Sequence, residues 1–210
     1  MLGVEIEGAV DAGGRTIHFK ADRADLDGTQ LLLTDYKTGR TIDSGKRAST
    51  RARNFLKQVR TGKRLQASTY ALAGLSSTMA RTGRFLFLDP DTEDHARDFS
   101  VEDADSDFIT AAGSAWSVVS EAWDAGVFLP RIVGPTGSKQ GDACDRCRMR
   151  QSCRLGDSGY RRRVIEHVQR HTPVFKRTPT QLPAVRQSLL RLWWLGQEPP
   201  DYPEEQHDDE

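Results

Sequence analysis

Asp22, Asp35 and Lys37 have the residue types and the spacing of a metal-dependent hydrolytic site on a β-sheet. In an extended segment Asp35 and Lys37 would point to the same face, because side chains alternate along a strand. Two converging carboxylates suit Mg²⁺, which prefers oxygen ligands, and the metal could polarise a phosphoryl oxygen and activate a water. Lys37 could then position that water and stabilise charge that develops on the phosphate. A structural Asp–Lys ion pair at a strand end is the alternative, and the bare triplet favours it.

Three strands joined by tight turns are expected to position these residues. The turn signals are Asp11-Ala12-Gly13-Gly14 and Asp27-Gly28, and the expected strands cover residues 4–10, 15–25 and 30–37. The third strand opens with Leu31-Leu32-Leu33, a continuous apolar run that indicates burial on both faces and a central position in the sheet. In such an antiparallel meander, Asp22 reaches the same place as Asp35.

Further along the chain, the pattern predicts helices that alternate with short strands. A basic loop or helix follows residue 39, and the later elements are a helix over 62–80, strands over 84–88 and 96–101, a helix over 105–126, a basic helix over 160–171 and an amphipathic stretch over 182–194. We expect Trp116 and Trp123 to pack in the core, and Trp193 and Trp194 to dock a C-terminal helix or bind a partner rather than stack on bases. This order predicts an α/β fold, a mixed sheet flanked by helices.

Charge is strongly segregated although the formal net charge is zero. Residues 37–64 contain ten Lys or Arg and a single acid, and residues 144–163 contain seven Arg and two acids. Basic segments near a metal site suit a polyanionic substrate, because each phosphate contact releases counterions; solvated charged faces are the alternative. No apolar run approaches the about 20 residues of a membrane span, and no signal peptide is recognisable, so we expect a cytoplasmic protein with no membrane partner.

Three cysteines, Cys144, Cys147 and Cys153, lie within ten residues of one another. An odd and tight cluster suits metal ligation in a reducing cytosol better than a disulfide framework. The spacing alone is compatible with both zinc and an iron–sulfur cluster.

Four motifs in this order resemble the nuclease domain of the RecB/AddB family, within the PD-(D/E)XK superfamily. They are Ala21-Asp22-Arg23-Ala24-Asp25, Leu33-Thr34-Asp35-Tyr36-Lys37-Thr38-Gly39, Gln66-Ala67-Ser68-Thr69-Tyr70, and the cysteine trio with its C-x₂-C-x₅-C spacing. The resemblance covers roughly residues 4–163. It implies a restriction-endonuclease-like core over residues 1–130, a cysteine-bearing extension over 131–172, and a helical, then acidic and disordered tail over 173–210.

The resemblance also implies a role for each motif residue. Asp22 and Asp35 would bind Mg²⁺ or Mn²⁺, and Lys37 would be the catalytic lysine. Gln66 and Tyr70, one helical turn apart, would lie beside the active site and touch DNA.

The cysteine trio would hold a [4Fe–4S] cluster that needs a fourth ligand from outside this chain. The chain departs from the family pattern at Phe19, where the family usually has glycine. The family also has a helix before its first strand, with a His or Glu for the metal and a further cysteine, so we expect a domain truncated at its N-terminus. Glu5 or Glu7 could supply a further acidic ligand, whereas we expect His18 to be structural.

Together these features predict Mg²⁺-dependent hydrolysis of DNA within a helicase–nuclease that processes double-strand breaks. The sequence has no P-loop pattern, so the helicase would be an upstream domain or another subunit. Three alternatives stay open: a stand-alone nuclease of the same superfamily, such as the CRISPR adaptation type; a fragment that binds DNA without cleaving it; and a zinc-stabilised interaction module.

Overall fold

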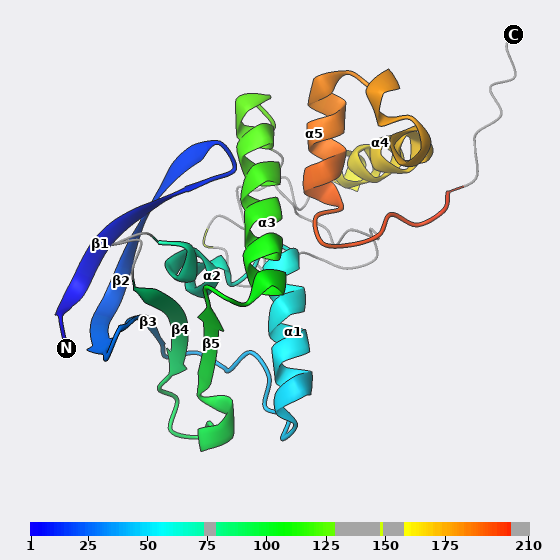
Figure 1. Ribbon diagram of the computed structural model, residues 1–210. Helices are drawn as coiled ribbons and strands as arrows, with labels where there is room; N and C mark the ends of the chain where they lie inside the picture. Colours follow the sequence, from blue (N-terminus) through cyan, green and yellow to red (C-terminus); the bar gives the residue numbers. More distant parts are fainter. Residues whose placement is uncertain (74–78, 129–147, 149–157, 203–210) are drawn as a thin grey trace, which may run out of the picture. The chain divides into compact units, whose positions relative to one another are not determined.

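A computed structural model of the chain describes residues 1–73, 79–128, 148 and 158–202 (Figure 1). Contacts within the chain define two compact units, Met1–Ser120 and Glu121–Glu210. The first unit contains the sheet and every residue of the predicted metal site. In the described part of the chain, no helix is long and apolar enough to cross a membrane.

Five strands in the order β1-β2-β3-β4-β5 form one sheet among the described residues. They are β1 (Gly3–Ala12), β2 (Arg15–Asp27), β3 (Gln30–Lys37), β4 (Ala80–Phe87) and β5 (Asp98–Glu102). The first three form the predicted antiparallel meander, β4 joins β3 in parallel, and β5 pairs with β4 antiparallel. The predicted α/β class, a mixed sheet flanked by helices, is confirmed.

Strand β3 occupies the central position that its apolar run predicted. Its side chains Leu31 and Leu33 are only 2% and 1% exposed, and they pack in a cluster with Tyr70 and Ala73. Leu32 is half-buried, so the burial is less complete on its side of the strand than the run suggested. The strand therefore carries Asp35 out of a hydrophobic cluster to the end of the sheet.

Helices α1 (Ala48–Arg60), α2 (Leu65–Leu72) and α3 (Ser106–Asp124) contribute to the main core of the first unit. Phe55 of α1 lies at the centre, with its ring 5.9 Å from that of Phe85 and 5.7 Å from that of Phe99. Ala111 and Ala112 of α3 belong to the same cluster. The core thus ties the basic helix α1 to strands β4 and β5, beside the strand that carries Asp35.

Helix α2 lies unusually close to β4, and Gly83 makes this possible. A Cβ at Gly83 would lie 1.8 Å from the Ala67 carbonyl oxygen and 2.8 Å from the Tyr70 Cβ. Any side chain at this position would force the helix away from the sheet. Gly83 therefore sets the distance between α2 and the sheet, and with it how far the side chains of α2 reach toward β3.

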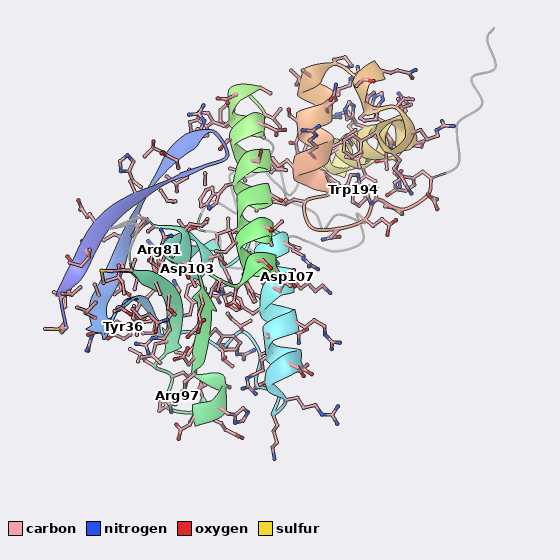
Figure 2. All side chains as sticks on the ribbon, viewed as in Figure 1. Tyr36, Arg81, Arg97, Asp103, Asp107 and Trp194 are labelled. Atoms are coloured by element: carbon pink, nitrogen blue, oxygen red, sulfur yellow. The ribbon has the colours of Figure 1, made fainter. Side chains whose placement is uncertain are left out.

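Two predicted elements differ in length from the observed ones. The helix expected over 62–80 is wrong in its bounds, because α2 ends at Leu72 and β4 already begins at Ala80. Strand β4 was expected to begin only at residue 84. Its polar first half is held by contacts outside the strand. Arg81 donates to the Leu72 carbonyl oxygen and pairs with Asp103; Arg81 and Asp103 are labelled in Figure 2. A local pattern cannot reveal such contacts.

The four tryptophans test the predicted packing. Trp116 is half-buried and its indole N–H donates to Thr69 Oγ1 at 3.0 Å, so its packing role is confirmed. Trp123 is 59% exposed, and the prediction that it lies in the core is wrong. Its position late in α3, near the helix end at Asp124, places it beyond the sheet-facing residues of that helix. Trp193 and Trp194 lie in the second unit.

In the second unit, α4 (Ser158–Arg177), the short η4 (Pro179–Gln181) and α5 (Ala184–Trp193) enclose a small core of their own. Trp193 and Trp194 are 2% and 4% exposed, which confirms that they pack rather than present their rings to solvent. The Trp194 indole N–H donates to Thr172 Oγ1, and that hydroxyl donates to the Val168 carbonyl oxygen. The predicted limits of the extension and tail stay predictions.

We predict that Gly83→Ala lowers the free energy of unfolding by at least about 2 kcal/mol, because the new methyl group meets the backbone of α2. Gly113→Ala is the matched control: nothing lies within 4 Å of its added Cβ, on α3. Removing a glycine from a helix interior should raise stability by about 0.5–1 kcal/mol. Urea unfolding of both variants measures the difference, and equal stabilities would contradict the close contact.

Candidate active site

The register of β2 against β3 brings Asp22 opposite Asp35. The paired residues end at Arg23 and Thr34, so the next position on each strand is an aspartate. Asp22 Oδ2 accepts a 2.7 Å hydrogen bond from the Tyr36 backbone N–H. The Asp22 side chain thus occupies the edge of the ladder where the backbone pairing stops, and the two carboxylates are cross-strand neighbours.

Asp35, Lys37 and Gln66 form a closed set of contacts. The Lys37 ammonium nitrogen lies 2.5 Å from Asp35 Oδ2 and donates to Gln66 Oε1 at 2.8 Å. The Gln66 amide nitrogen donates to Asp35 Oδ1 at 2.9 Å. Gln66 thereby fixes the lysine and the carboxylate at once, one from each end of its amide group.

Asp35 is 5% exposed, and its two oxygens differ in their surroundings. Oδ1 accepts from Gln66, whereas the buried Oδ2 has no hydrogen-bond donor, because Lys37 approaches it as an ion pair without hydrogen-bond geometry. A buried carboxylate oxygen without a donor is costly. The charge of the Lys37 ammonium, 2.5 Å from Oδ2, offsets that cost.

Tyr70 lies on the buried side of the site. It is fully buried, its hydroxyl donates to the Lys20 carbonyl oxygen at 2.9 Å, and its ring lies 5.1 Å from that of Phe19. Burial raises the pKa of Tyr70 well above its ordinary value, and the nearby Asp35 and Asp22 carboxylates raise it further. The hydroxyl is therefore a neutral donor. Phe19, which stands where the family motif usually has glycine, supplies the aromatic ring against which Tyr70 packs.

The first strand contributes acids near the site, but they contact a lysine. Glu5 Oε2 lies 2.7 Å from Lys20 Nζ, and Glu7 pairs in register with Lys20. The bond to Glu5 raises the pKa of Lys20, with smaller contributions from Glu7 and Asp22. No group of three His, Cys, Asp or Glu side chains that could hold a metal occurs among the described residues. A further ligand from Glu5 or Glu7 stays a prediction, and His18 is exposed opposite Ala9.

The donor set fits a hard divalent cation. Asp22 and Asp35 supply carboxylate oxygens, which Mg²⁺ and Mn²⁺ prefer, and Mg²⁺ usually keeps several waters when one or two carboxylates hold it. The Asp22 carboxylate is exposed, whereas both Asp35 oxygens are already contacted, Oδ1 by Gln66 and Oδ2 by Lys37, so an ion at Asp35 would take the place of one of these contacts. Bound there, the ion would supply Lewis acidity and lower the pKa of a water.

The predicted site residues therefore separate into two groups. The structure brings Asp22, Asp35, Lys37, Gln66 and Tyr70 together. The predicted cluster ligands lie outside the described residues: Cys144, Cys147 and Cys153.

Two supporting residues were not singled out from the sequence. Gly83 sets the height of α2, and a glycine within a strand is a signal of close backbone approach that could have found it. Phe85 lies beneath the site, with its ring centroid 5.2 Å from the Lys37 ammonium. Nothing in the sequence pattern distinguishes Phe85 from the other core aromatics.

A family model described as PD-(D/E)XK nuclease superfamily matches residues 1–154. The match covers most of the chain, and the chain belongs to this superfamily. The observed sheet and its flanking helices are consistent with the restriction-endonuclease-like fold of these enzymes, which use Mg²⁺ or Mn²⁺ and act as hydrolases on nucleic acid. Searches of curated proteins and of solved structures gave no significant match.

The raised pKa of Tyr70 gives a pH-dependent prediction. Tyr70 holds its proton more tightly in the folded than in the unfolded chain. The neutral, buried Tyr70 side chain therefore contributes its full stabilisation below pH 10.0, and this stabilisation is lost as the pH rises through the folded-state pKa of Tyr70. The stability difference between wild type and Tyr70→Phe should be constant near neutral pH and shift in favour of the variant above pH 10.0. Urea unfolding from pH 7 to pH 11 measures it; a pH-independent difference would contradict a buried neutral tyrosine.

Proposed function

We propose that this chain is a Mg²⁺- or Mn²⁺-dependent deoxyribonuclease that hydrolyses DNA phosphodiester bonds. The observation that carries the proposal is the arrangement of Asp22 opposite Asp35 with Lys37 held beside them. Membership in a nuclease superfamily supports the reaction class, and the basic surface described below supports DNA as the substrate.

Each side chain has a defined task in this reaction. Asp22 and Asp35 hold the metal ion, and Asp35 also binds the Lys37 ammonium. Lys37 directs its remaining N–H bonds toward a phosphate oxygen or the attacking water, and stabilises negative charge that develops on the phosphate. Gln66 holds Lys37 in position through its carbonyl oxygen. The Tyr70 side chain is buried and uncharged, and it excludes water from the buried side of Asp35.

Helix α1 offers a surface for the DNA backbone. Arg53, Lys57 and Arg60 are exposed and recur at helical spacing, while Phe55 and Val59 face the core. Cations along one side of a helix can contact successive phosphates without reading base sequence. The basic segment therefore presents charge on the outside of the same unit that carries the metal site.

The nuclease prediction is tested at Asp35. Asp35→Asn keeps the size of the side chain but removes its charge, so Mg²⁺-dependent cleavage of single- and double-stranded DNA should fall at least about 100-fold. Asp98→Asn is the matched control, because Asp98 of β5 is also a strand carboxylate paired with a cation, in its case Arg84 of β4. It should cleave like wild type in a gel assay with labelled oligonucleotides.

The outcomes separate the candidate functions. Equal cleavage by wild type and Asp35→Asn would mean that the catalytic assignment is wrong. DNA binding by wild type without cleavage in either Mg²⁺ or Mn²⁺ would favour the alternative of a chain that binds DNA without chemistry.

We further propose that Cys144, Cys147 and Cys153 hold a [4Fe–4S] cluster with a fourth ligand from another segment or partner. We also propose that the nuclease works with a helicase motor in double-strand break repair in the cytoplasm. The motif resemblance supports both proposals, and the absence of a P-loop from the sequence supports a separate motor. Zinc is the alternative occupant of the cysteines.

The cluster predicts a brown protein. Chain purified without oxygen should contain iron and acid-labile sulfide and absorb broadly in visible light, and Cys147→Ser should lose iron and colour. Ser68→Ala, a change of a hydroxyl residue on α2, should keep both. A colourless protein with bound zinc would instead support the interaction module and exclude the cluster.

A further inference from the structure

Arg64 directly precedes α2, and its backbone has a conformation that residues with side chains rarely adopt. Its φ of 54° and ψ of 39° are left-handed, and it follows Gly62, whose φ of 75° is ordinary for glycine. Glycine would adopt the Arg64 conformation at less cost, because Cβ clashes with the backbone there. Non-glycine residues in this region of φ and ψ gather at functional sites, where the surroundings hold them.

The Arg64 guanidinium lies over two aromatic rings of β4. Its central carbon is 6.0 Å from the centroid of the Phe85 ring and 5.7 Å from that of Phe87. The Lys37 ammonium lies 5.2 Å from the same Phe85 centroid. One fully buried aromatic ring therefore has two cations beside it, one from the end of β3 and one from the start of α2.

The two cations differ in their partners. Lys37 is paired with Asp35 and bonded to Gln66. For Arg64, no carboxylate partner occurs among the residues that the structure describes. The guanidinium is half-buried against the rings, so it is partly desolvated and held in place while its charge stays uncompensated.

Packing alone does not account for an arginine at this position. Stacking on aromatic rings stabilises the side chain, but the left-handed backbone opposes an arginine there. A planar guanidinium with several fixed donors is suited to bidentate binding of a phosphate group. An anion bound by Arg64 would balance the charge that has no carboxylate partner among the described residues.

We propose that Arg64 binds a backbone phosphate of the DNA strand next to the phosphate at Lys37, and so sets the position of that strand in the active site. This inference rests on the proposed nuclease function and adds a substrate-binding residue outside the family motifs. The contact is to the phosphate, so it should act equally on all base sequences.

The test is Arg64→Gly, which removes the guanidinium and also relieves the left-handed strain. The variant should melt at the temperature of wild type or above it, yet its KM for single-stranded DNA should rise about tenfold, the effect of one charge-assisted contact. Binding is measured separately by fluorescence anisotropy in an Asp35→Asn background. There the slope of log affinity against log salt should fall by about 0.7, the value for one phosphate of a single strand.

Two further variants keep the test decisive. Arg64→Asn also tolerates the left-handed conformation and repeats the measurement if the glycine variant melts earlier. Lys176→Ala removes one positive charge from α4, where Lys176 pairs with Asp201, and should leave affinity and salt slope unchanged.

The outcomes distinguish this inference from the function on which it rests. Stable Arg64→Gly and Arg64→Asn variants with wild-type affinity and salt slope would overturn the phosphate contact, even if cleavage depends on Asp35. Cleavage that does not depend on Asp35 would overturn the assignment of the catalytic site. The anisotropy measurement, which needs no cleavage, would still decide whether Arg64 binds DNA.

Discussion

The site depends on how closely helix α2 can lie on strand β4, and this distance is set by Gly83. With no side chain at Gly83, the Ala67 carbonyl oxygen comes to within 1.8 Å of where a Cβ would be. At that height, Gln66 reaches both Asp35 and the lysine beside it, and Tyr70 reaches the backbone of β2. A helix raised by even one methyl group would lose these contacts together, since they come from two successive turns of one rigid element.

The electrostatics of the site follow from the same arrangement. Asp35 is buried but paired with the Lys37 ammonium, so these two charges largely balance each other. Asp22 adds a second carboxylate, and among the described residues its one hydrogen bond comes from the Tyr36 backbone N–H, so it adds negative charge at the end of the β2–β3 ladder. The buried Asp35 Oδ2 has no hydrogen bond and is contacted by the Lys37 ammonium. A divalent cation would balance the charge of Asp22, and to bind Asp35 Oδ2 as well it would displace the Lys37 contact.

The part of the fold that sequence predicts best is the part held by local signals. The turns at Gly13-Gly14 and Gly28 end the first strands, and β3 has the predicted bounds Gln30–Lys37. Because the meander follows from these turns, the meeting of Asp22 with Asp35 could be predicted. The first half of β4 could not be, since its polar residues gain their partners from β3 and from Asp103, far away in sequence. The motif spacing predicted that Gln66 would be near the site, but not that it would bond Asp35 and Lys37 together.

Arg64 shows why the remaining part of the site is invisible to sequence patterns. It is one of ten basic residues between 37 and 64, and nothing in their order distinguishes it. Its conformation results from the short connection between α1 and α2. Thr61, Gly62 and Lys63 bond back to the last turn of α1, and α2 begins at Leu65. Because α1 and α2 both bury residues in the same core, these few residues must place both helices against it, and glycine occupies only one of the two left-handed positions of the connection. The strain at Arg64 is therefore a consequence of tertiary packing, and it places a guanidinium at the active site by the same turn that delivers Gln66.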